Sequence, residues 1–177
     1  MANWYGSART NYVRLAKGVT IDDLRKRLDL LDLGLEIWTQ GQDEDLKVGF
    51  GPGDMTDDGA FPGFIHSDID EDDERLPALM KLLGYDDQDE FLSAIYNDEI
   101  EFDWGTLIMP MVEAGEVLVV QTIGAEKLRY LTGRADAFVR NEDGVVRHVG
   151  VSISDIYKTA HKAFGLDEAR QISLCEY

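Results

Sequence analysis

Apolar and polar residues follow two different periods along the chain, and its first part contains both. Residues 11–16 alternate with the period of a short strand. Thr20 and Asp23 have the spacing of a capping box, which predicts that a helix begins here. The buried face of this helix is expected to consist of three leucines at helical spacing, namely Leu24, Leu28 and Leu31.

Glycine and polar clusters predict how this first part continues. Gly34 predicts the end of the helix, because glycine readily adopts the left-handed backbone conformation that closes helices. Two strands are predicted over residues 35–39 and 46–50, joined by a polar turn. Residues 51–64 are rich in Gly, Pro and Asp, so we expect an irregular surface loop there.

The middle of the chain combines helical apolar spacing with many acidic residues. One apolar stripe predicts a helix that Gly84 closes, and it consists of Leu76, Leu79, Met80 and Leu83. A second stripe predicts a helix after the acidic residues 86–90, and it consists of Phe91, Leu92 and Ile95. Residues 99–104 alternate with period two, which predicts a strand with three acids on its exposed face, Glu99, Glu101 and Asp103.

The last third of the chain has the pattern of further strands and a closing helix. Residues 116–123 predict one strand, and residues 134–151 predict a hairpin whose turn contains the pair Asp143-Gly144. Ser152 and Asp155 again have capping-box spacing, and the apolar face of the helix that follows is expected to consist of Ile153, Ile156, Tyr157, Ala160 and Phe164. Together these elements predict one α+β domain over residues 1–177, with an antiparallel sheet, two or more packed helices and an acidic surface segment.

The acidic residues change this picture because they are concentrated in one part of the chain. The chain has 35 acidic and 17 basic residues and a formal net charge of -18. Residues 43–103, which we call the acidic segment, hold 20 of the acids and three of the bases, whereas the remaining residues are close to neutral. Adaptation to high salt would acidify the whole surface instead. This charge disfavours nucleic acid and anionic membranes as partners and favours a basic protein.

The acidic segment is the main candidate binding site. Duplex DNA carries one charge per about 1.7 Å of axis, so the excess of seventeen negative charges corresponds to about 29 Å of duplex. A folded surface of that charge density could occupy the basic groove of a nucleic-acid-binding protein or complex. The residues expected to bind the partner are Asp68, Asp70, Glu71, Asp72, Asp73, Glu74, Asp86, Asp87, Asp89, Glu90, Glu99, Glu101 and Asp103.

Residues suited to catalysis or metal binding do not form a recognisable pattern. The three histidines, His66, His148 and His161, have neither zinc-site nor triad spacing. Residues 68–72 have the alternating acids of a calcium loop, but Asp73 and Leu79 occupy the positions that require glycine and glutamate. We therefore predict no catalytic residue, no metal site and no cofactor, and expect a binding protein rather than an enzyme.

The chain also has features of a cytoplasmic protein. Cys175 is the only cysteine, so no disulfide can form within one chain. No run of eighteen apolar residues occurs, and residues 1–10 lack the order of a secretory signal. We expect a protein of the bacterial cytoplasm on these grounds and on the resemblance that follows.

Three stretches resemble a family of uncharacterised acidic proteins carried by bacterial plasmids and phages. They are residues 3–12, the run that begins at Glu99 and ends at Tyr130, and Ser154–Tyr157 with the closing pair Glu176-Tyr177. The resemblance implies a setting on mobile genetic elements, where small acidic proteins counter host restriction or CRISPR systems. It implies no catalytic residues, and the match is poorest over residues 54–98.

Three hypotheses about function follow. The first is a nucleic-acid mimic that inhibits a DNA-binding host defence complex, either CRISPR–Cas or restriction. The second is an immunity or antitoxin protein that captures a basic nuclease toxin, which charge alone does not distinguish from the first. The third is a metal-dependent enzyme that uses the aspartate-rich loop at residues 68–72.

Overall fold

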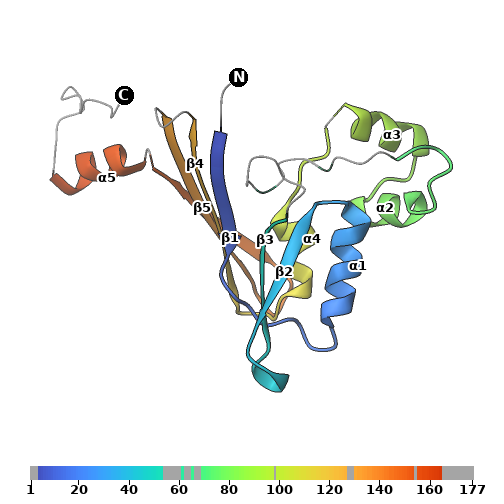
Figure 1. Ribbon diagram of the computed structural model, residues 1–177, viewed down its shortest axis with the longest axis horizontal. Helices are drawn as coiled ribbons and strands as arrows, with labels where there is room; N and C mark the ends of the chain where they lie inside the picture. The colour runs from blue at the N-terminus through green and yellow to red at the C-terminus, as the bar shows by residue number, and fades with distance from the viewer. Residues whose placement is uncertain are drawn as a thin grey trace.

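The computed structural model contains two antiparallel sheets and five α-helices in the residues that it describes, which are 4–53, 61, 65, 69–97, 99–126, 130–153 and 155–164 (Figure 1). The larger sheet has the strand order β1-β4-β5-β6, made by β1 (Trp4–Thr10), β4 (Val117–Glu126), β5 (Tyr130–Arg140) and β6 (Val146–Ser152). The smaller sheet pairs β2 (Leu35–Gln40) with β3 (Lys47–Pro52). These elements confirm the α+β class.

The helices lie unevenly about the larger sheet. They are α1 (Ile21–Leu31), α2 (Leu76–Leu83), α3 (Gln88–Tyr96), α4 (Trp104–Leu107) and α5 (Asp155–Phe164). The first four helices and the β2–β3 pair lie on one side of the larger sheet, whereas α5 projects on the other side from the end of β6 (Figure 1). No helix in the described ranges is long and apolar enough to cross a lipid bilayer.

The predicted capping box and buried face of α1 are confirmed, and its predicted end is wrong. The Asp23 amide donates to the Thr20 hydroxyl at 3.1 Å, and the Thr20 amide donates to the Asp23 carboxylate at 2.9 Å. The helix ends at Asp32, two residues before Gly34, with a left-handed φ of 50°. Aspartate tolerates this conformation better than most residues, so it ended the helix without glycine.

The strand predicted over residues 11–16 is wrong, because the N-terminal strand β1 precedes it. From Asn11 onward the chain forms only isolated bridges, from Val13 to Val48 and from Leu15 to Val112. The Val13 bridge and the Thr10 hydroxyl, which accepts a hydrogen bond of 2.7 Å from the Phe50 amide, join the larger sheet to β3. Thr10 is the one buried polar side chain among the described residues.

The core lies between the larger sheet and the elements on its covered side. Its fully buried side chains come from α1, β3, α2, α3, β4 and the chain around α4, and the largest include Phe50, Phe91, Leu24, Leu79, Ile108 and Leu118. The predicted β4 strand and the β5–β6 hairpin are confirmed, and Gly144 has the positive φ of 86° that the turn between β5 and β6 requires. The end of the molecule that carries α2 and α3 is therefore attached to the core.

Candidate acidic interaction surface

Helices α2 and α3 attach the acidic segment to an apolar base. Both predicted stripes are confirmed, since five side chains from these helices are at most 6% exposed, namely Leu76, Leu79, Phe91, Ala94 and Ile95. Tyr85, in the turn between the helices, contacts Phe91 edge to face with ring centroids 5.2 Å apart. Gly84 ends α2 with the left-handed φ of 79° that its position predicts. The acidic side chains of α3 and of the turns beside both helices therefore have a fixed scaffold.

Arg75 connects the start of α2 to the end of α1. Its guanidinium donates to the Asp73 carboxylate at 2.9 Å and lies 3.9 Å from the Asp32 carboxylate at the end of α1. The hydrogen bonds from Arg75 lower the pKa of Asp73 below its usual value. Asp73 was predicted as a partner-binding residue, and the structure instead places it in an internal ion pair.

The acidic start of α3 contains one structural residue and three exposed ones. The Asp87 carboxylate accepts a hydrogen bond of 2.9 Å from the Glu90 amide and so caps the helix. Asp89 and Glu90 lie in the first helical turn, where a negative charge favours the positive end of the helix dipole. Asp86, Asp89 and Glu90 are exposed.

Residues 99–104 alternate as predicted in burial but do not form a strand. Ile100, Phe102 and Trp104 are buried, and Trp104 begins α4. Asp103 caps this helix, because its carboxylate accepts hydrogen bonds from the Gly105 amide at 2.9 Å and from the Thr106 amide at 3.0 Å. A helix start took the place of the predicted strand because Asp103 satisfies the free amides of its first turn.

The capping hydrogen bonds change the ionisation of Asp103. Burial raises its pKa, but the hydrogen bonds from Thr106 and Gly105 outweigh this effect and leave the pKa below its usual value. Asp103 is therefore held as a charged capping group, rather than as one of three equivalent acids on an open strand.

Eight of the predicted acids remain exposed carboxylates that make no hydrogen bond or ion pair within the described part of the chain. We call them the free carboxylates, and they are Glu71, Asp72, Glu74, Asp86, Asp89, Glu90, Glu99 and Glu101. They lie before α2, at the start of α3 and between α3 and α4. Helices α2 and α3 lie at the end of the molecule away from the larger sheet (Figure 1). Asp70 accepts a hydrogen bond from the Asp72 amide at 3.1 Å, and Asp68 lies outside the described residues.

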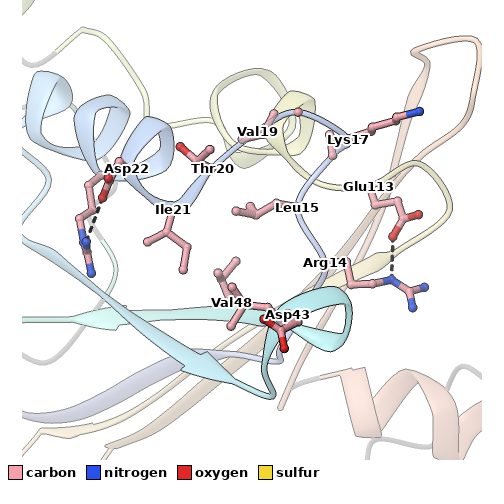
Figure 2. A pocket seen from close by; sticks show the side chains of 14 residues that line it. Arg14, Leu15, Lys17, Val19, Thr20, Ile21, Asp22, Asp43, Val48 and Glu113 are labelled. Carbon is pink, nitrogen blue, oxygen red and sulfur yellow. Dashed lines mark hydrogen bonds and ion pairs between the residues drawn. The ribbon is translucent and has the colours of Figure 1, made fainter.

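A groove of about 1080 Å³ lies elsewhere, between the start of α1, the β2–β3 turn and residues 14–18 (Figure 2). Its floor is apolar and its rim carries paired charges, because Arg14 bonds to Glu113 at 2.6 Å and Arg25 bonds to Asp22 at 3.1 Å. Each cation of these pairs is already neutralised. The rim also carries Lys17 and Asp43, one charge of each sign, so it is not a concentrated acidic surface.

An ion-pair cluster on the covered side of the β5–β6 hairpin was missed by the sequence reasoning. Asp136 accepts hydrogen bonds from Arg134 at 2.6 Å and contacts His148 Nε2 at 2.7 Å, while Phe138 stacks on the His148 ring. Burial raises the pKa of Asp136, but the hydrogen bonds from Arg134 and His148 outweigh this effect and lower it. The hairpin register pairs Asp136 with Gly150 and could have revealed this proximity.

This cluster lacks the partners that catalysis would need. No serine, threonine or cysteine among the described residues hydrogen-bonds to His148, so no pair of nucleophile and base is formed there. The described residues also contain no group of three or more His, Cys, Asp or Glu side chains placed to hold a metal ion. His66 and Cys175 lie outside the described residues, as does Asp68, the first residue of the calcium-like loop at residues 68–72.

Comparisons of the chain with protein-family models, with curated proteins and with solved structures return no match. The resemblance to acidic proteins of plasmids and phages therefore stays a prediction.

Proposed function

We propose that this protein binds the basic groove of a nucleic-acid-binding protein through the free carboxylates and so prevents that groove from binding nucleic acid. The observation that carries the proposal is that these carboxylates lie in α3 and in the segments directly beside α2 and α3, which are attached to the core, yet make no internal ion pair or hydrogen bond. Carboxylates fixed on a scaffold can bind without the entropy cost of ordering a loop. A host restriction or CRISPR complex is the class of partner that the resemblance favours.

The number of free carboxylates limits the footprint. Eight charges, at the spacing of duplex DNA of about 1.7 Å per charge, correspond to about 14 Å, or about four base pairs. Asp73, Asp87 and Asp103 are excluded from this set because each stabilises the fold. We therefore expect a compact contact with one basic site, and an association that weakens strongly as salt screens the charges.

Two matched variants test the proposal. The triple variant Asp86→Asn, Asp89→Asn and Glu90→Gln removes three free carboxylates at the start of α3 and leaves the Asp87 cap intact. The control Asp29→Asn, Glu36→Gln and Glu142→Gln removes the same charge from exposed positions outside α2 and α3. Each protein is immobilised, exposed to a bacterial lysate at low salt and washed with duplex DNA.

We expect the wild-type and control proteins to retain the same bound protein, which DNA displaces, and the triple variant to retain at least tenfold less of it. Equal capture by the triple variant would contradict the proposal, as would the absence of any DNA-displaceable partner. A bound nuclease that DNA does not displace would favour the immunity or antitoxin function instead.

A further inference from the structure

The outer face of the larger sheet, on the side opposite α1–α4, is apolar and largely uncovered. Cross-strand partners share a face of the sheet. On β4 the outer face consists of every second residue from Val117 to Ile123, and on β5 it consists of every second residue from Gly133 to Val139. Their neighbours on β6 are Val149 and Val151. The residues between them face the core, where Leu118, Val120 and Phe138 are buried.

The exposure of this outer face is unusual for large aliphatic side chains. Val149 is 64% exposed, Ile123 62%, Val151 56%, Ile153 51% and Val117 47%. Ile123, Ile153 and Gly133 help to line a shallow hollow of about 270 Å³ on the same face. Isolated exposed aliphatic residues are common, but a contiguous patch across three strands marks an interaction surface.

We infer that this outer face binds the same face of a second copy of the chain, as two sheets packed face to face. A second copy can approach this face without placing carboxylate against carboxylate, because the outward positions of the four strands contain no aspartate or glutamate in a chain of net charge -18. Its exposed cations, Arg9 and Arg147, lie on the two edge strands and so at the rim. Two copies that meet here keep their acidic segments on opposite sides of the pair.

The area of the face sets the expected strength of the dimer. Four strands about 4.8 Å apart, with about seven residues each at about 3.4 Å per residue, give roughly 450 Å² of flat area per copy. Two copies therefore bury roughly 900 Å², close to the lower limit of about 1,000 Å² for a specific interface. The dimer should be weak and should dissociate on dilution. The inference does not depend on what the acidic surface binds.

Light scattering and sedimentation over about a thousandfold range of protein concentration test the inference. We expect the mass of the wild type to fall from dimer to monomer on dilution. Val149→Lys should raise the dissociation constant at least tenfold, and Ile123→Lys, on a different strand, provides the same test if the first variant fails to fold. Val145→Lys is the matched control, since Val145 is 53% exposed but lies in the turn before β6.

The opposite results overturn the inference. A wild type that stays monomeric throughout excludes the dimer, including the case in which α5 covers the face of its own chain. A dimer that both variants leave intact, or that Val145→Lys weakens equally, places the interface elsewhere. Added salt should strengthen this contact by screening the net charge, whereas it should weaken binding at the free carboxylates, so the two surfaces can fail independently.

Discussion

The acidic helices and the larger sheet expose opposite kinds of side chain for the same physical reason. In α2 and α3 the helical period turns one apolar stripe inward, and the carboxylates of α3 and of the turns beside the two helices stay outside. In the larger sheet a period of two produces two faces, and the molecule covers only one of them, so the second remains apolar and exposed. Which side chains are exposed therefore depends on the spacing of apolar residues along the chain and on whether another layer of the fold covers that face.

The largest effect on stability is expected when the same substitution, phenylalanine to alanine, is made at a buried and at an exposed position. Phe91 of α3 is fully buried, whereas Phe164 of α5 is 74% exposed. Phe91→Ala should lower the free energy of unfolding by about 3–5 kcal/mol, and Phe164→Ala should change it by less than about 0.5 kcal/mol. Urea unfolding at one fixed protein concentration measures both values. A small effect of Phe91→Ala would mean that the acidic segment is a solvated loop without a core.

A second, smaller effect is expected at the contact between the two sheets. Thr10→Val removes the hydroxyl that accepts the Phe50 amide and leaves that buried amide without a partner. The expected loss of stability is about 1–3 kcal/mol, because a buried amide bears the cost of its lost hydration. Thr10→Ser retains the hydroxyl and is the control. If thermal unfolding shows equal losses for both variants, packing of the threonine methyl group matters more than its hydrogen bond.

The smallest effect concerns the Asp103 cap and depends on pH. The pKa of Asp103 in the folded protein lies below its usual value of 3.8, so the charged form stabilises the fold fully above that value. This stabilisation is lost as the pH falls through the lowered folded pKa. Asp103→Asn keeps an oxygen acceptor but cannot ionise, so we expect it to be less stable than wild type by about 0.3–1 kcal/mol at neutral pH.

Unfolding measured from neutral pH down to about pH 2 checks this prediction. The difference between wild type and Asp103→Asn should shrink below about pH 4. Asp29→Asn is the control, since Asp29 is an exposed residue of α1 whose side chain makes no hydrogen bond or ion pair within the described ranges. A difference that stays constant with pH would show that the charge of Asp103 does not contribute to the cap.

Much of the fold could be predicted from the sequence because local signals were strong. The capping box of α1, both apolar stripes and the turn at Gly144 each depend on residues only a few positions apart. The strand β1 was missed because its order depends on pairing with β4, more than a hundred residues away, which no local period encodes. The strand predicted over residues 99–104 is wrong because alternate burial also occurs in an extended segment that leads into a capped helix.

The candidate surface was predicted in composition and only partly in detail. Charge density identified α2 and α3, but it could not separate the free carboxylates from Asp73, Asp87 and Asp103, because capping and pairing depend on neighbours in space. The uncovered sheet face was not predicted either. Three of its strands, β4, β5 and β6, were recognised, yet their period does not state which face another layer will cover.

The pairing of β1 with β4 also constrains the order in which the chain can fold during synthesis. Trp4 pairs with Glu126, so the first strand emerges from the ribosome long before its partner exists. At about 5–20 residues per second, that delay lasts roughly 6–24 seconds. During this time α1, the β2–β3 pair and both acidic helices are already complete, and the larger sheet closes last. The nascent chain thus displays its negative charge before it acquires the apolar face.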